Sequence, residues 1–138
     1  MRVELGTWDA LREEAVAIRH AVFVEEQRVP VELEIDEQDP VSVHALARDA
    51  SGRALGTGRL LPDGHIGRMA VLAAARGTGV GSALLIALMD ESRRRGGRET
   101  IVSAQTHAIA FYARHGFVTE GNEYDDAGIP HITMRCAL

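Results

Sequence analysis

The sequence predicts one α+β (mixed α/β) domain, built on a central mixed, mostly antiparallel sheet with helices on both faces. Two features predict this fold class. Strand-like runs at residues 41–49, 53–61 and 65–72 follow one another across short turns, as in an antiparallel meander. Strands and helices then alternate toward the C-terminus, and parallel strands need such crossover connections. Because the chain has 138 residues and no linker or internal repeat, residues 1–138 are expected to form this single domain.

The N-terminal half is expected to begin with a strand and a helix. Residues 2–6 are typical of a short strand, and Thr7 is a suitable N-cap for the helix after it. Apolar side chains recur there at a spacing near 3.6 as far as Val22, and Pro30 ends any helical continuation. Turns between the three following strands are expected at Ala50-Ser51-Gly52 and Pro62-Asp63-Gly64.

The C-terminal half is expected to alternate helices and strands. A strongly apolar helix follows a glycine-rich segment, and Gly96 and Gly97 end it. The elements expected in order are a helix at 79–94, a strand at 99–104, a helix at 107–115, a strand at 117–120, a polar turn at 125–128 and a last strand at 131–137.

Composition argues against a membrane protein. The chain is 46% hydrophobic and 25% charged, which is typical of a soluble globular protein. Its longest apolar stretch, residues 83–89, is far shorter than the about 20 residues that cross a bilayer. Residues 1–6 also lack the basic start and apolar run of a signal peptide. We therefore expect a cytoplasmic protein without a membrane partner.

Charge and side-chain chemistry exclude further classes. A net charge of −5 argues against a nucleic-acid partner, and the lack of any lysine excludes a P-loop or Schiff-base lysine. The lone Cys136 makes no intramolecular disulfide and is expected to pack in the core. Five of the six histidines have no metal-ligand spacing, so no metal is expected. Their side chains are expected at the surface or at helix caps: His20, His44, His65, His107 and His115.

The most informative segment is Arg76-Gly77-Thr78-Gly79-Val80-Gly81, between a strand and a long helix. Alternate glycines allow a tight turn whose N–H groups point inward beside the positive end of a helix dipole, a geometry that suits a pyrophosphate. The dinucleotide pattern G-x-G-x-x-G is not met, because Ser82 or Leu84 stands where its third glycine belongs. Taken alone, the hexapeptide is equally compatible with a helix start that binds no ligand.

Two further segments give this hexapeptide a context. Met69-Ala70-Val71 precedes it, and Ala110-Phe111-Tyr112-Ala113-Arg114-His115-Gly116-Phe117 follows about thirty residues later. In order and spacing, the three parts resemble the acetyl-CoA motif of the GCN5-related N-acetyltransferase (GNAT) superfamily, R-G-x-G-x-G followed by F-Y-x-x-x-G-F. The stretch from Val22 to Pro30, with Glu34, Asp36 and Asp39 after it, is similar to the ElaA/YjcF branch.

The resemblance implies a GNAT fold and acetyl-CoA as co-substrate. Tyr112 matches the tyrosine whose hydroxyl meets the departing thiolate, and a phenol with a pKa near 10 suits that role. Gln105 stands where many members have an asparagine that contacts the cofactor. The cofactor-binding residues that it implies are Met69, Ala70, Val71, Arg76, Gly77, Thr78, Gly79, Val80, Gly81, Ser82 and Gln105.

The acceptor side is less determined by the sequence. Residues 25–39 hold seven carboxylates and one arginine, which indicates either a solvated surface or a site that attracts a cationic amine. Glu26, Glu34 and His131 are candidates for acceptor binding and for the general base; a water relay or a backbone carbonyl is another. The predicted function is direct acetyl transfer to a primary amine of a small molecule, by a monomer or homodimer, without a covalent acetyl-enzyme. The alternative is a non-catalytic domain that binds acyl-CoA.

Overall fold

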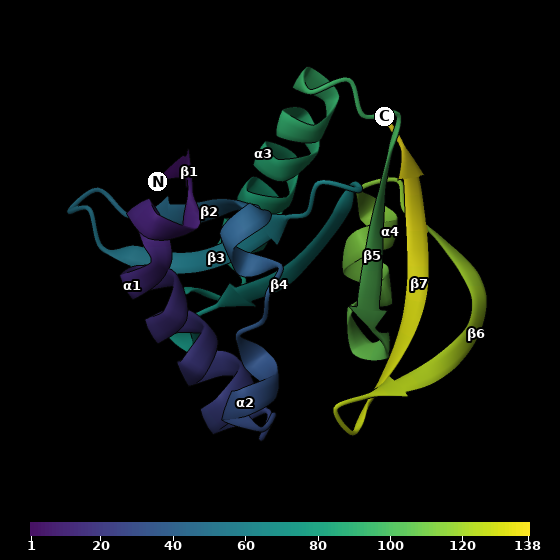
Figure 1. Cartoon of the computed structure of the whole chain (residues 1–138), viewed down its shortest axis with the longest axis horizontal. Helices are drawn as coiled ribbons and strands as arrows, with labels where there is room; N and C mark the ends of the chain where they lie inside the picture. The colour runs from purple at the N-terminus through teal and green to yellow at the C-terminus, as the bar shows by residue number, and fades with distance from the viewer.

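A computed structural model describes residues 1–138, apart from the side chain of Leu33. It contains one seven-stranded sheet in the order β1-β2-β3-β4-β5-β7-β6 (Figure 1). Neighbouring strands are antiparallel except β4 and β5, which are parallel. The strands are β1 (Arg2–Gly6), β2 (Val43–Arg48), β3 (Ala54–Leu60), β4 (His65–Val71), β5 (Glu99–Gln105), β6 (Val118–Asp126) and β7 (Ile129–Ala137).

Helical segments connect the strands and cover the sheet. The α-helices are α1 (Trp8–Arg19), α2 (Val31–Glu34), α3 (Val80–Arg94) and α4 (Ile109–Arg114). The chain also forms the π-helical segment η1 (His20–Glu26) and the short 3-10 turns η2 (Asp39–Val41), η3 (Ala73–Ala75) and η4 (Thr106–Ala108). This arrangement confirms the expected fold class, a mixed and mostly antiparallel sheet with helices.

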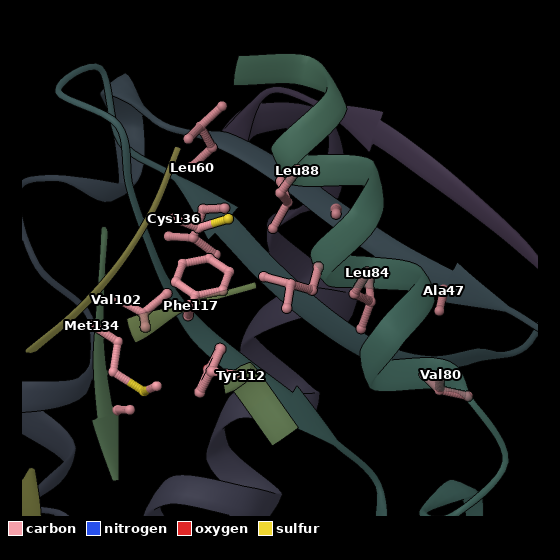
Figure 2. Close-up of a cluster of buried hydrophobic side chains, with 14 of the residues drawn as sticks. Ala47, Leu60, Val80, Leu84, Leu88, Val102, Tyr112, Phe117, Met134 and Cys136 are labelled. Carbon is pink, nitrogen blue, oxygen red and sulfur yellow. The ribbon is translucent and has the colours of Figure 1, made fainter. Parts of the chain in front are cut away.

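Alternate residues of β2 show that helices lie on both faces of the sheet. Ala45 and Ala47 belong to the core cluster that α3 and α4 form with the sheet, whereas Leu46 belongs to the cluster of α1. Successive side chains of a strand point to opposite faces, so α1 and α3 pack on opposite sides. Leu84 and Leu88 bring α3 against the sheet in the first cluster (Figure 2). Cys136 is buried in that cluster, as its sequence position predicts.

The N-terminal helix agrees with the sequence expectation, whereas strand β6 differs from it. The helix is capped by Thr7, whose Oγ1 accepts the N–H of Ala10 at 3.3 Å, and after Arg19 the chain continues in helical form as η1 to Glu26, before Pro30. Strand β6 extends to Asp126, well beyond the predicted residue 120. All of β6 is exposed, and its polar residues have the composition of a turn; pairing with β7 keeps them extended.

The sheet opens between its two parallel strands. β4 and β5 are paired only at His65 with Ile101 and at Ile66 with Val102. Beyond these pairs the strands diverge, as Figure 1 shows. A bulge in β4 accompanies the divergence: Arg68 has φ +49°, and two residues of β4 stand opposite one of β3. The split places an opening in the middle of the sheet.

Candidate active site

A cavity of about 810 Å³ lies at this opening, lined by residues of η1, β4, β5, η4, α4, β7 and the turn between β6 and β7. Many of the residues singled out from the sequence line it together. They are Glu26, Glu34, Met69, Ala70, Val71, Arg76, Gln105, Tyr112 and His131. The other predicted residues, Gly77, Thr78, Gly79, Val80, Gly81 and Ser82, form the loop before α3 and its first turn.

The backbone of β4 presents polar groups to the opening. Leu72 donates its N–H to the carbonyl of Leu55 on β3 at 2.9 Å, and Ala70 is paired with Thr57 on the same strand. Because backbone groups alternate in direction along a strand, those of Met69 and Val71 point to the opposite side, where β5 has moved away. Ala70 thus contributes to the sheet with its backbone, while Met69 and Val71 present theirs to the cavity.

The glycine loop has the backbone that its sequence predicts. Gly77 and Gly79 have φ +77° and +87°, a region that glycine adopts without strain, and Gly79 is the N-cap of α3. Apart from the adjacent residues of the chain, no described atom lies within 4 Å of where a Cβ would stand at either position. In the first helical turn the N–H groups have no intrahelical acceptor. The loop therefore leaves open a cradle of N–H groups, which fits a phosphate group.

Neighbouring contacts hold this loop in place. Thr78 Oγ1 donates a hydrogen bond to the carbonyl of Ala75, and Val80 is buried in the core. A Cβ on Gly81 would stand 3.4 Å from the ring of Phe111, so this glycine lets α4 lie close to α3. Ser82 Oγ is 2.9 Å from Nε2 of His115 on the same side.

Arg76 is held by the chain itself. Its Nε donates to the carbonyl of Val71 at 3.0 Å, and its Nη2 donates to both carboxylate oxygens of Glu26, at 2.9 and 2.8 Å. Both side chains are about half exposed. Glu26, on η1, therefore neutralises the arginine that the sequence assigns to the pyrophosphate.

Tyr112 is a buried side chain on the cavity wall. The rings of Phe111 and Phe117 contact it edge-on, with centroids 5.1 and 5.7 Å away. Burial raises the pKa of Tyr112 to about 12, because a phenolate loses its hydration there. The hydroxyl therefore keeps its proton at neutral pH and remains a hydrogen-bond donor.

Gln105 lies at the end of β5 and has a partner that the sequence did not indicate. Its Nε2 donates to Oε1 of Gln27 at 2.9 Å, and its own Oε1 is 2.6 Å from Nε2 of His107. Gln27 follows η1, so this pair of amides ties η1 to β5 across the cavity. The contact between Gln27 and Gln105 was not predicted, because no local sequence signal relates residues 78 positions apart.

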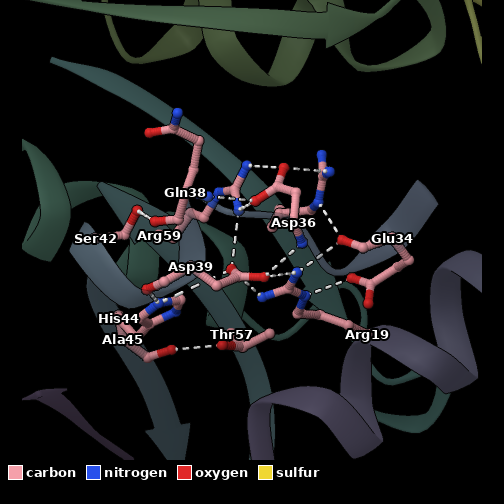
Figure 3. Close-up of polar contacts among 11 residues, drawn as sticks. Arg19, Glu34, Asp36, Gln38, Asp39, Ser42, His44, Ala45, Thr57 and Arg59 are labelled. Atoms are coloured by element: carbon pink, nitrogen blue, oxygen red, sulfur yellow. Dashed lines mark hydrogen bonds and ion pairs between the residues drawn. The ribbon is translucent and has the colours of Figure 1, made fainter. Parts of the chain in front are cut away.

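Three carboxylates of the acidic segment form a buried ion-pair network with arginines (Figure 3). Arg19 is bonded to Glu34 and to both oxygens of Asp39, at 2.8 and 3.0 Å for the latter. Arg59 bonds Asp36 at 2.7 Å and Asp39 at 2.9 Å. Arg68 adds a contact of 3.1 Å to Asp36.

The arginines of the network lower the pKa of two of its carboxylates, Asp36 and Asp39. Hydrogen bonds from Arg59 lower the pKa of Asp36 to about 2. Burial alone would raise the pKa of Asp39, but its hydrogen bonds with Arg19 and Arg59 outweigh burial and hold that pKa below its usual range. Three arginines thus balance three carboxylates.

These pairs correct the interpretation of the acidic segment. Glu34 is 3% and Asp39 0% exposed, so a solvated surface is wrong for them. Although Glu34 lines the cavity, its carboxylate is engaged by Arg19. Sequence reasoning missed Arg19, yet it lies four residues after Ala15 and therefore on the apolar stripe of α1. A charge at such a position is the signal that could have revealed the network.

His44 is also placed differently from expectation. It is 1% exposed, packs on Trp8 with ring centroids 4.8 Å apart, and places Nε2 2.9 Å from the carbonyl of Asp39. Burial lowers the pKa of His44, so the neutral imidazole belongs to the fold. A surface or capping position was the wrong expectation for this histidine.

Among the residues that the structure describes, no group of three or more His, Cys, Asp or Glu side chains is placed to hold a metal ion. No described helix has both the length and the apolar character to cross a membrane.

Known proteins share this sequence and architecture. A sequence profile of the acetyltransferase (GNAT) domain matches residues 9–138. The chain is 40% identical over 125 residues to the uncharacterised N-acetyltransferase YjcF of Bacillus subtilis, covering 88% of this chain and 89% of that protein. Its fold is similar to Escherichia coli ElaA, with a TM-score of 0.87 and 27% identity over 99% of both chains.

An acyl-CoA N-acyltransferase from Pseudomonas aeruginosa is similar to the same extent, with a TM-score of 0.86 and 33% identity over 99% of both chains. Proteins of this family use acyl-CoA as the co-substrate for transfer to small molecules. The matched sequence, the divided sheet and the glycine loop before α3 agree with one another. The chain therefore belongs to the GNAT acetyltransferase superfamily, in its ElaA/YjcF-like branch, and is an acyltransferase enzyme.

Proposed function

We propose that this enzyme transfers the acetyl group of acetyl-CoA directly to a primary amine of a small molecule. The observation that carries the proposal is the opening between β4 and β5. Beside it lie the glycine loop and the backbone groups of Met69 and Val71 that point away from β3, and Tyr112 lines the same cavity. One elongated ligand, with a phosphate-rich end and a reactive end, fits such an arrangement.

The loop and β4 are proposed to bind the cofactor. The N–H groups of residues 77–82 would bind the pyrophosphate with help from Arg76, since an anion is favoured at a helix N-terminus. The backbone groups of Met69 and the N–H of Val71 would bind the pantetheine arm along the open strand, since the carbonyl of Val71 already accepts a hydrogen bond from Arg76. When bound, acetyl-CoA supplies a thioester whose carbonyl carbon accepts the amine. An N–H of β4 would stabilise the negative charge that develops on its oxygen.

Tyr112 is proposed as the acid. Its raised pKa keeps the phenol protonated in the free enzyme. The phenol would give its proton to the sulfur as negative charge develops there during cleavage of the C–S bond. A route through an acetyl-cysteine thioester is not supported, because Cys136 packs in the core with its Sγ 3.6 Å from the carbonyl of His115. These points favour direct transfer.

The acceptor is proposed to enter the half of the cavity near η1 and β7. Glu26, Glu34 and His131 line that cavity, as the sequence analysis expected for acceptor-binding groups. Since Arg76 and Arg19 neutralise the two carboxylates, attraction of a cation by the acidic segment is weaker than its composition suggests. A cytoplasmic location, the monomeric or dimeric state and the single-domain organisation stay predictions.

An experiment on the purified protein tests this function in two stages. Calorimetry first measures whether acetyl-CoA binds and whether adenosine 3′,5′-bisphosphate, which carries only its nucleotide part, competes. Release of free thiol is then followed with a panel of amines: spermidine, tyramine, lysine and glucosamine 6-phosphate. Saturable binding followed by amine-dependent thiol release is expected. Binding without release for every amine would contradict the transfer, and no binding would contradict the whole assignment.

A further inference from the structure

His131 is a buried histidine on the wall of the active-site cavity. It lies in β7, where Gln105 of β5 and Tyr124 of β6 are its paired neighbours. It is 8% exposed, and it lines the same cavity as Tyr112. If His131 accepted a proton, it would do so in the same cavity in which Tyr112 is proposed to donate one.

One hydrogen bond determines which ring nitrogen of His131 carries the proton. Its Nδ1 lies 2.7 Å from the carbonyl oxygen of Ile129. A carbonyl oxygen can only accept a hydrogen bond, so Nδ1 must carry the proton and donate it. In the neutral imidazole the lone pair then resides on Nε2, at the outer end of the ring. The chain thus selects the tautomer in which Nε2 is basic.

The ring is also held in orientation. Tyr124 stacks on it, with ring centroids 6.1 Å apart and planes 24° from parallel. The hydroxyl of Tyr124 is in turn hydrogen-bonded to Ser103 Oγ on β5. Contacts at Nδ1 and on one face of the ring restrict its rotation, so the lone pair of Nε2 keeps a defined direction.

The other two candidates for a base are already committed. Glu34 is paired with Arg19 in the buried network, and Glu26 is paired with Arg76. A proton taken up by the carboxylate oxygen that accepts the arginine's hydrogen bond would break that bond. In the described part of the chain, by contrast, nothing is hydrogen-bonded to Nε2 of His131.

We infer that Nε2 of His131 is the general base of the transfer, an inference that rests on the proposed function. Nε2 takes one proton from the acceptor ammonium, directly or through a water molecule. The amine nitrogen then forms a C–N bond to the acetyl carbon as the C–S bond breaks, and the sulfur takes the proton of the Tyr112 hydroxyl. The second nitrogen proton restores that hydroxyl, and His131 releases its proton to solvent, so one proton is released per turnover.

Two substitutions separate a base from a merely structural histidine. His131→Asn keeps an N–H near the position of Nδ1, for the bond to Ile129, but lacks the basic nitrogen. We expect kcat to fall about 10²–10⁴-fold while the acetyl-CoA dissociation constant stays within about twofold. His131→Ala should lose as much and regain activity with added imidazole. His20→Gln, an exposed histidine on η1, is the matched control and should retain wild-type kcat.

The tautomer of His131 can be measured in the enzyme alone, without an acceptor amine. In the ¹⁵N-labelled wild-type enzyme at neutral to mildly alkaline pH, long-range ¹H–¹⁵N correlations should show His131 protonated at Nδ1 and bare at Nε2. Protonation at Nε2 would overturn the inference, as would an Asn variant with wild-type kcat under chemistry-limited conditions. Neither outcome touches the proposed function, which fails instead if the wild-type protein does not bind acetyl-CoA.

Discussion

At the scale of single residues, Tyr112 shows how burial prepares a side chain for one role. A phenol whose pKa lies near 12 carries its proton throughout the physiological range. It therefore acts as a donor and not as a base. The rings of Phe111 and Phe117 pack edge-on against it, and the residue lines the cavity.

Tyr112→Phe should lower kcat at least tenfold and leave the CoA dissociation constant within a few fold. The reason is that the hydroxyl is needed only as charge develops on the sulfur, so its removal raises the barrier rather than weakening the ground-state complex. Steady-state kinetics together with calorimetry measure both quantities. Insensitivity of the wild-type kcat to solvent viscosity would first establish that chemistry limits the rate. An unaltered kcat in the variant would remove Tyr112 from the mechanism.

Glu26 is a second residue whose role is set by its partner. In the free enzyme it holds the guanidinium that the pyrophosphate is proposed to bind, so the cofactor must displace it. An exposed ion pair is worth at most about 1 kcal/mol, which limits the cost of this displacement.

Glu26→Gln should therefore tighten CoA binding by up to about fivefold, because Arg76 no longer has to exchange a carboxylate for the phosphate. Glu25→Gln is the matched control: it makes the same change of charge one residue away, on a side chain that faces His20. Calorimetric titrations at low and high salt compare the three proteins. Equal tightening in both variants would assign the effect to overall charge, and weaker binding in Glu26→Gln would show that the carboxylate helps the cofactor.

At the scale of elements, the loop before α3 depends on backbone conformation. Gly79 combines a positive φ with open space where a side chain would stand. A substitution there acts on the backbone and on an approaching ligand, because it meets no described neighbour within 4 Å. The same is true of Gly96 at the other end of α3, which has φ +85°.

Gly79→Val should weaken CoA binding by well over tenfold, since a β-branched residue disfavours the left-handed conformation and fills the N–H cradle. Gly96→Val imposes similar strain at the opposite end of α3, away from the cavity. Urea denaturation should show comparable losses of stability in the two variants, and calorimetry should show lost affinity in Gly79→Val alone. Unchanged CoA affinity in a folded Gly79→Val variant would contradict the assignment of this loop.

At the scale of the whole molecule, the buried network joins α1, the segment after α2 and three strands. Breaking a buried pair leaves an uncompensated charge, so such networks make a fold sensitive to protonation. Asp36 and Asp39 have lowered pKa values, and burial lowers that of His44. In all three cases the unfolded chain binds protons more readily than the folded one.

The free energy of unfolding should therefore decrease as the pH is lowered, in two ranges. Below about pH 6.5 the unfolded chain takes up a proton at His44, whereas the buried imidazole of the folded protein resists protonation. Between about pH 4 and pH 2 the unfolded chain takes up a proton at Asp36, which stays ionised in the folded protein. Lowering the pKa of Asp36 from 3.8 to about 2 corresponds to about 2 kcal/mol at neutral pH. Urea denaturation across pH 3 to 8 measures the profile. Asp36→Asn should be less stable and should flatten the acidic range; an unchanged slope would contradict the role of Asp36.

Several features of this protein were determined by local sequence. Glycine spacing, apolar periodicity and the position of Thr7 specify turns and helices through interactions between near neighbours, and the structure confirms them at Gly77, Gly79 and α3. The same local motifs indicated the family. Where local signals were weak, as in the polar second half of β6, the prediction was wrong because pairing with β7 outweighs local propensity.

Only the tertiary structure decided which charged and amide side chains of the site pair with one another. Arg19 bonds Asp39 across 20 residues of sequence, Arg76 bonds Glu26 across 50, and Gln105 bonds Gln27 across 78. Such pairs depend on which elements the fold brings together, and sequence spacing carries no information about them. Whether a carboxylate in residues 25–39 is exposed or buried, and which arginine it pairs with, depends on the elements that pack around it. Folding thus set the electrostatics of a site whose glycine loop was already evident from the sequence.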